Sequence, residues 1–282
     1  MAMVDRRSNK PGPELDAGEA AAQILESREA PRVGADFPVE LHSPGFDAPL
    51  PARARDISTG GICFATASQV ALDSLRSVTL ALPNGRTRLN VEAKWQTTQG
   101  LDDSVLTGAV FVGLLPAEAA SLWDVVDKTS RDIGSFLYET FREHGATLDD
   151  AMSIAQTTRM RVVPRGRFIC QRHEPQEPGD DSIFIVHQGS VELTLPIRAG
   201  REVRLGKGGA GTLLGGLGSV AGMLPMESAQ TREETQLLEV SRSAFSYLRV
   251  SKPLLAHWLG QVIMGGHLRR MDAVVSRLAE DG

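Results

Sequence analysis

The sequence predicts a mainly β protein with helices: a small antiparallel β-barrel, a helical connector, a second strand-rich domain and a C-terminal helix. Short apolar–polar alternations separated by turn residues recur in the first half of the chain, a pattern typical of small antiparallel barrels. Further strand-like runs follow between Arg161 and Val240, with amphipathic helical patterns on either side. A length of 282 residues suits two domains of roughly 100–200 residues each. We therefore divide the chain into a tail (1–19), a first domain (20–128), a connector (129–158), a second domain (159–250) and a C-terminal helix (251–282).

The first domain is predicted to contain six strands and a closing helix. Residues 1–18 mix charged residues, Pro and Gly without periodicity, as disordered tails do, and a short helix is expected at 20–25. The clearest strand, from Leu89 to Trp95, alternates apolar and polar side chains. Pro116 suits the first turn of an amphipathic helix. The strand runs are 37–41, 52–57, 61–65, 78–82, 89–95 and 108–112.

The last segment is predicted to be a helix that pairs two copies of the chain. Pro253 suits its first turn, and Gly265-Gly266 is expected to bend or interrupt it. Beyond these glycines, apolar residues spaced by three, four and three positions form a coiled-coil-like seam. The seam predicts a homodimer through this helix, and it consists of Leu268, Met271, Val275 and Leu278.

Composition and charge argue against several classes of protein. A net charge of −5 does not suit a protein that neutralises nucleic-acid phosphates, although a few arginines suffice for a small anion. No apolar run of about 18 residues is present, and the N-terminus has no signal core, so we expect a cytoplasmic protein without a membrane span. Cys63 and Cys170 lie in apolar runs without metal-ligand spacing, which favours buried free thiols. We find no catalytic constellation and expect no enzyme, metal or cofactor.

Two motifs in the first domain suit an anionic nucleotide. Arg28 and Arg32 form R-x-x-x-R, and Asp56, Ser58 and Gly61 form D-x-S-x-x-G. Arginine presents a fork of donors that matches phosphate oxygens and the O6/N7 edge of guanine. Aspartate accepts the N–H donors of guanine, and the serine hydroxyl bonds to base or phosphate. The glycines of the second motif are expected to permit a bend with positive φ and a close approach of the ligand.

The stretch from residue 28 to about residue 126 resembles PilZ domains, the receptors of the bacterial second messenger cyclic di-GMP. The resemblance rests on both motifs in order, on the strand with Lys94-Trp95 and on Gly108–Phe111. It implies ligand contacts at Arg28, Arg32, Asp56, Ser58 and Gly61, with Gly60 in the same turn and Trp95 as a candidate base-side contact. The alternatives are ordinary surface arginines, a turn capped by Asp56 and Ser58, and a core role for Trp95.

Residues from about 159 to 259 resemble the jelly roll of cyclic-nucleotide-binding domains. The resemblance rests on 161–169, 181–186, 189–193 and 239–245, where aliphatic strands and glycine turns recur in order. The family binds ribose and cyclic phosphate with a Gly-Glu pair and a later Pro-Arg.

This chain departs from that binding pattern. Gly216 stands in place of the glutamate, and Met226 or Glu227 in place of the arginine, with no evident replacement for the lost charge pair. We expect no cyclic AMP or cyclic GMP binding, unless Arg201 or Arg232 folds inward.

These features together predict a cyclic-di-GMP receptor that changes conformation on ligand binding and acts through an unidentified protein partner. No helix-turn-helix follows the C-terminal helix, so direct nucleic-acid binding is not expected. The alternatives are a ligand-independent scaffold and a cyclic AMP or cyclic GMP sensor that uses the second barrel.

Overall fold

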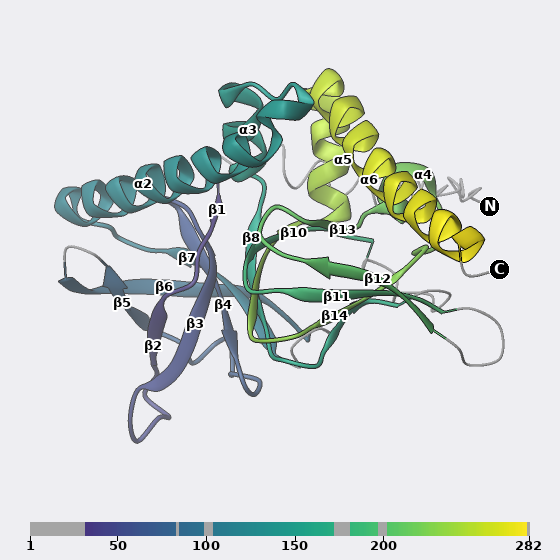
Figure 1. Ribbon diagram of the computed structural model, residues 1–282. Helices are drawn as coiled ribbons and strands as arrows, with labels where there is room; N and C mark the ends of the chain where they lie inside the picture. Colours follow the sequence, from purple (N-terminus) through teal and green to yellow (C-terminus); the bar gives the residue numbers. More distant parts are fainter. Residues whose placement is uncertain (1–31, 83–84, 99–103, 172–180, 197–201, 281–282) are drawn as a thin grey trace, which may run out of the picture.

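The computed structural model describes residues 32–82, 85–98, 104–171, 181–196 and 202–280. Two β domains lie side by side, and a layer of helices covers one side of both (Figure 1). The predicted tail, the short helix at 20–25 and Arg28 lie outside the described residues.

The first domain is a closed antiparallel barrel of six strands, as predicted. The strand order is β3-β2-β5-β6-β7-β4, and pairing of β3 with β4 closes the ring, while the short β1 adds to the far end of β3. Alternate side chains such as Val39, Phe64 and Leu80 point inward and form the core. The strands are β1 (Val33–Gly34), β2 (Pro38–His42), β3 (Leu50–Ile57), β4 (Gly61–Thr66), β5 (Ser77–Leu82), β6 (Gly85–Thr98) and β7 (Val105–Phe111).

A single long helix, α2 (Pro116–Phe141), belongs to both domains. It begins at Pro116, where the Glu118 carboxylate accepts the backbone N–H of Leu115 at 2.8 Å. Its first half packs Leu122 on the barrel core, and its second half packs Leu137 on the second domain. The predicted boundary between residues 128 and 129 therefore falls inside a helix that both cores share. A 3₁₀ turn, η1 (Arg142–His144), and α3 (Leu148–Ala155) complete the connector.

The second domain is a sandwich of two four-stranded antiparallel sheets, as the predicted jelly roll requires. The sheets have the orders β13-β10-β15-β8 and β12-β11-β14-β9. Phe184 and Leu237 from one sheet meet Val191 and Ala229 from the other in a common core. The elements are β8 (Arg159–Val163), β9 (Phe168–Cys170), β10 (Ile183–Gln188), β11 (Val191–Pro196), β12 (Glu202–Gly208), β13 (Leu213–Gly215), α4 (Leu217–Ala221), β14 (Ser228–Thr231) and β15 (Thr235–Val240).

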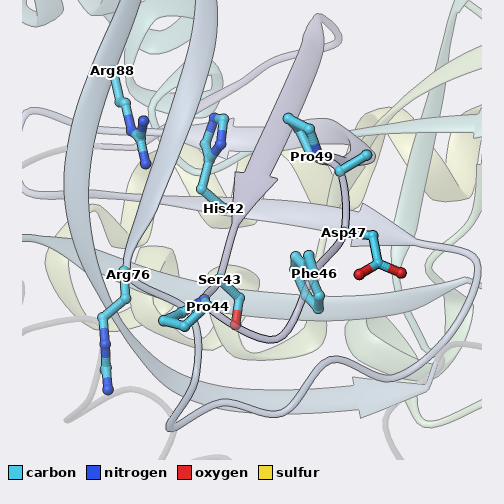
Figure 2. Close-up of a pocket in the computed structure, with 9 residues that line it drawn as sticks. His42, Ser43, Pro44, Phe46, Asp47, Pro49, Arg76 and Arg88 are labelled. Atoms are coloured by element: carbon cyan, nitrogen blue, oxygen red, sulfur yellow. The ribbon is translucent and has the colours of Figure 1, made fainter.

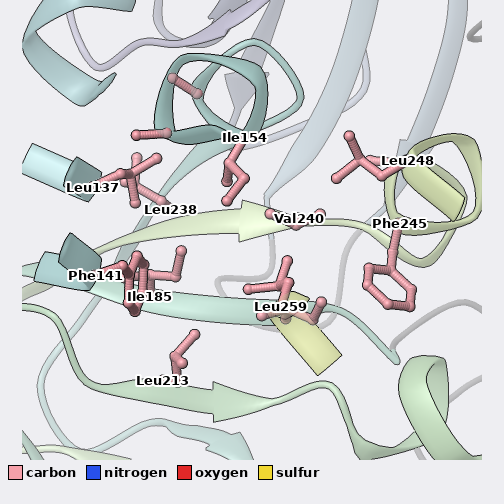
Figure 3. Packing of buried hydrophobic residues seen from close by; sticks show 14 of the residues in the cluster. Leu137, Phe141, Ile154, Ile185, Leu213, Leu238, Val240, Phe245, Leu248 and Leu259 are labelled. Atoms are coloured by element: carbon pink, nitrogen blue, oxygen red, sulfur yellow. The ribbon is translucent and has the colours of Figure 1, made fainter. Parts of the chain in front are cut away.

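The other face of the β13-β10-β15-β8 sheet is covered by helices (Figure 3). Ile185 and Val240 of the sheet pack there against Leu137 of α2, Phe245 of α5 (Arg242–Ser251) and Leu259 of α6 (Pro253–Glu280). This core holds α2 and the C-terminal helices on one surface.

The helix α6 runs without interruption through Gly265-Gly266, so no break occurs where the sequence predicted a bend or interruption. The buried side chains of Ile263 and His267 lie on either side of the two glycines. Their packing on the sandwich offsets the intrinsic cost of about 1 kcal/mol for each helical glycine. None of the described helices is long and apolar enough to cross a bilayer.

Candidate ligand site at the domain interface

The pairing of β1 with β3 brings the two sequence motifs together. Gly34 is the register partner of Asp56, so Arg32, two residues before Gly34, lies on the same side of the sheet as Asp56. Arg32 Nη1 donates a hydrogen bond to Asp56 Oδ1 at 2.6 Å. The Asp56 side chain is 2% exposed and that of Arg32 is 22% exposed. The pair therefore joins a buried carboxylate to a cation that still reaches solvent.

Asp56 and Trp95 stand at the two ends of one row across the outer face of the barrel. The successive register partners are Asp56 of β3, Cys63 of β4, Gly108 of β7 and Trp95 of β6. A β-bulge precedes each end residue and turns its side chain outward. Three strand spacings separate the ends by about 14 Å. The row offers an acceptor at one end and an aromatic face at the other.

Trp95 lies over Gly108 and outside the barrel core. A Cβ atom on Gly108 would stand only 2.2 Å from Trp95 Cε2, so the glycine leaves the space that the indole fills. The Trp95 side chain is 38% exposed, which leaves part of the ring free to stack on a base.

The turn after β3 is held by the Ser58 hydroxyl. Ser58 Oγ accepts the backbone N–H groups of Gly60 at 3.3 Å and Gly61 at 3.1 Å. The same hydroxyl donates to the Gly61 carbonyl at 3.2 Å, and Ser58 is buried. In this structure Ser58 shapes the turn, the role that the sequence offered as its alternative.

The glycines of this turn do not adopt the positive φ that we expected of them. Gly61 is needed for another reason, because a Cβ there would lie 2.4 Å from the Ala109 carbonyl oxygen and 3.3 Å from Arg32 Nη2. Gly60 has open space around it. Gly61 therefore allows close pairing of β4 with β7 beside the Arg32–Asp56 pair.

A second arginine reaches the same carboxylate from the other domain. Arg159, the first residue of β8, places Nε 3.3 Å from Asp56 Oδ2, and its side chain is 24% exposed. Burial lowers the pKa of the Arg159 guanidinium, but the negative charges of Asp56 and Glu239 help to hold the pKa above its ordinary value. The sequence carries no signal for this contact, because nothing in it indicates which strand of the second domain faces the barrel.

The outer face of the barrel is the interface between the domains. Cys63 at the centre of the row is completely buried, and burial together with the nearby Asp56 charge raises the pKa of its thiol to about 12. Both cysteines are buried and free, as expected. Gln236 of β15 donates to Asp36 Oδ2 at 3.2 Å across the interface. Beside the row lies a cavity of about 580 Å³, lined among others by Arg53 and Arg55 of the barrel and by Val162 and Pro164 of the second domain.

Another cavity, of about 430 Å³, lies among the barrel loops, and none of the predicted site residues lines it (Figure 2). His42 Nε2 lies 2.8 Å from Thr79 Oγ1, and Arg88 Nε donates to Ser77 Oγ at 2.9 Å. Burial and the charge of Arg88 lower the pKa of His42. Both side chains thus make contacts within the barrel itself.

The segment that binds phosphate in the resembling family contacts helix α6 in this chain. Arg270 of α6 donates from Nε to Glu227 Oε2 at 2.8 Å and from Nη2 to Oε1 at 2.5 Å. His267 Nδ1 lies 3.3 Å from the same Oε1 atom. Burial raises the pKa of Glu227, but hydrogen bonds from His267 and Arg270 more than offset this and lower it. Arg270 thus brings a cation to this segment that sequence reasoning missed, but Glu227 already pairs with it.

Gly216 and Arg232 also differ from what nucleotide binding in this segment would require. Gly216 has φ of +77°, and a Cβ there would stand 2.7 Å from Ile183 Cγ1, so the backbone favours glycine where the resembling family has glutamate. Arg232 does not fold inward, since its Nη1 donates to Glu192 Oε2 at 2.7 Å on the surface. Arg201 lies outside the described residues.

Family models match two parts of the chain. The model described as "PilZ domain" matches residues 26–126, and the model described as "Cyclic nucleotide-binding domain" matches residues 160–251. The chain therefore contains both domains, and both resemblances are confirmed. Both are regulatory ligand-binding domains of cyclic-nucleotide signalling and not catalytic ones.

Solved structures resemble part of the chain. A cyclic nucleotide-binding domain from Methylobacillus flagellatus KT has 16% identity and a TM-score of 0.47, covering 54% of this chain and 86% of that one. The catabolite activator protein of Thermus thermophilus has 25% identity and a TM-score of 0.41, with coverages of 50% and 62%. The c-di-GMP responsive global regulator CLP of Xanthomonas campestris has 21% identity and a TM-score of 0.39, with coverages of 47% and 65%. A search of curated protein sequences found no match.

Proposed function

We propose that this chain, which joins a PilZ domain to a cyclic nucleotide-binding domain, is a cyclic-di-GMP receptor that acts through a protein partner. The observation that carries the proposal is the Arg32–Asp56 pair beside Gly61, at one end of a row that ends in Trp95. Residues from both predicted motifs thus meet on one face of the barrel. Arg28, the other arginine of the first motif, completes the proposed site from outside the described residues.

The row matches the chemistry of a guanine dinucleotide. The Asp56 carboxylate accepts the N1–H and N2–H donors of one guanine. Arg32 presents its guanidinium to a phosphate or to the O6/N7 edge, and the half-exposed indole of Trp95 stacks on a base. Ser58 and Gly60 hold the turn that positions Asp56 beside Gly61.

The second barrel serves as a structural and partner-binding module in this proposal. Glu227, one of the two residues that stand in the place of the phosphate-binding arginine, is already paired with Arg270. A cyclic phosphate there would lie near the Glu227 carboxylate, which repels it. The Arg270 guanidinium could not offset this repulsion fully, because it is already paired with Glu227. Cyclic di-GMP on the first domain is therefore the ligand that controls the molecule.

The test is calorimetric titration of the full chain with cyclic di-GMP, cyclic AMP and cyclic GMP. We expect cyclic di-GMP alone to bind. Arg32→Ala should weaken binding about tenfold or more, because a charge-assisted hydrogen bond contributes roughly 1.5–3 kcal/mol. Arg232→Ala, which removes a surface arginine paired with Glu192, is the matched control and should bind normally.

Each other outcome selects an alternative. Binding of cyclic AMP or cyclic GMP alone would move the sensor to the second barrel. Failure of all three nucleotides to bind would leave a ligand-independent scaffold. Unchanged affinity in Arg32→Ala would reject this site even if cyclic di-GMP binds.

A further inference from the structure

One carboxylate at the candidate site pairs with two guanidinium groups from two domains. Arg32 of the first domain pairs with Asp56 Oδ1, and Arg159 of β8 in the second domain pairs with Asp56 Oδ2. Asp56 carries a single negative charge, so this cluster of described side chains keeps one positive charge in excess. An anion that reached this partly buried place would interact favourably with the excess charge.

Glu239, the register partner of Arg159 on the neighbouring strand β15, does not balance the excess charge. Glu239 Oε2 accepts from Arg161 Nε at 2.7 Å, and Glu239 Oε1 accepts from Ser182 Oγ at 2.7 Å. Arg159 and Arg161 thus share the single negative charge of Glu239, so even with Glu239 included the three arginines outnumber the two carboxylates by one. The charge of Arg159 remains available at the interface.

The geometry leaves Arg159 able to make a further contact. It approaches Asp56 through Nε, and its two terminal nitrogens make no hydrogen bond to a side chain or backbone that the structure describes. The start of β8 is held close to β1, because a Cβ on Gly34 would lie 3.0 Å from the Met160 nitrogen and 3.2 Å from the Arg159 carbonyl carbon. The backbone at Arg159 is therefore held against Gly34, which follows Arg32 by two residues in the sequence.

We propose that Arg159 is a ligand-contacting residue that the cyclic nucleotide-binding domain contributes to the PilZ site. Its terminal nitrogens bind a phosphate of the nucleotide whose guanine lies on Asp56. The ligand then lies between the domains and contacts both. Its binding changes the Arg159–Asp56 ion pair, the only one between Arg159 and the barrel among the described residues. This inference rests on the proposed function and adds a domain-crossing contact to it.

The experiment is a titration of the full chain with cyclic di-GMP in four forms: wild type, Arg159→Gln, Arg159→Lys and Arg165→Gln. Arg165 lies exposed just after β8 and serves as the control. Arg159→Gln should bind about tenfold more weakly, and Arg159→Lys, which keeps the charge, should lose less. Affinity in Arg159→Gln should also depend less on salt than in the wild type, which a purely structural role would not produce. Arg165→Gln should match the wild type.

The outcomes separate this inference from the proposed function. If the wild type binds and Arg32→Ala does not, while Arg159→Gln binds equally well or more tightly, the proposed function stands and the contact of Arg159 is rejected. If the wild type itself does not bind, both are rejected. Thermal unfolding of each variant shows whether the fold is kept. If Arg159→Gln unfolds, the affinity of a folded Arg159→Lys for cyclic di-GMP tests the contact instead.

Discussion

Single residues on the outer face of the barrel determine whether the site can form, and Gly61 is one of them. A methyl group at this position would collide with the Ala109 carbonyl oxygen at 2.4 Å and crowd Arg32 Nη2 at 3.3 Å. The first contact involves backbone of the paired strand β7, so relief requires the two strands to separate. The second displaces the guanidinium that holds Asp56.

We therefore expect Gly61→Ala to lower the free energy of unfolding by about 1–3 kcal/mol and to weaken cyclic-di-GMP binding. Gly60→Ala is the matched control, because a Cβ there meets nothing within 4 Å and its φ is not positive. Urea unfolding and calorimetry on both variants measure the two effects. Equal stability and equal affinity of the two variants would contradict the role given to Gly61.

How much of this site the sequence predicted also depends on particular residues. The spacing of Asp56, Ser58 and Gly61 belongs to one turn, so the motif could be located from local chemistry alone. Arg159 could not be found in this way, because its contact with Asp56 depends on how two folded domains pack. Arg270 was missed for the same reason, since helix α6 must first lie on the sandwich before it reaches Glu227.

At the scale of elements, the contact of α6 with the second barrel depends on a buried ion pair. Glu227 is 1% exposed in its side chain and accepts two hydrogen bonds from Arg270. Removal of one partner from a buried pair costs about 3–5 kcal/mol, because the other charge stays buried without compensation. The pair therefore fixes α6 to the segment that binds a phosphate in the resembling family.

Glu227→Gln should lower the free energy of unfolding at pH 7 by about 3 kcal/mol. The pKa of Glu227 is lowered in the folded state, so the stabilisation is fully present above the ordinary value of 4.5 and is lost as pH falls through the folded value. The difference between wild type and Glu227→Gln should therefore shrink below pH 4.5. Urea unfolding at a series of pH values measures this, with Arg242→Gln at an exposed pair as control. A difference that does not change with pH would contradict the assignment.

For the whole molecule, the shared helix α2 and the strand β8 connect the two domains at separate places. Helix α2 contributes Leu122 to one core and Leu137 to the other, which ties one side of the domains together. Strand β8 contacts the row that runs from Asp56 to Trp95 through the ion pair of Arg159 with Asp56. In the proposed function, a ligand that enters the row would change the contact between Arg159 and Asp56, while α2 would stay packed on both cores. Conformational change then follows from the difference in contacts between the free and bound states.

The homodimer that the sequence predicts would form through the C-terminal helix α6. Leu268 and Val275 are 57% and 66% exposed, whereas Val274 on the same helix is buried. The exposed residues are seven positions apart, as the a positions of a coiled coil are. A second copy of the chain that presents the same seam would bury both side chains against their equivalents.

Leu268→Glu should convert the proposed dimer into a monomer, because two glutamates would face each other in an apolar seam. Ser276→Glu is the matched control, since it adds the same charge at an exposed position outside the seam. Light scattering coupled to gel filtration gives the mass of each variant, with a chain mass of 30.3 kDa as the monomer reference. A wild-type chain that elutes with the monomer mass, with and without cyclic di-GMP, would reject the dimer. A dimer that survives Leu268→Glu would place the contact on another surface.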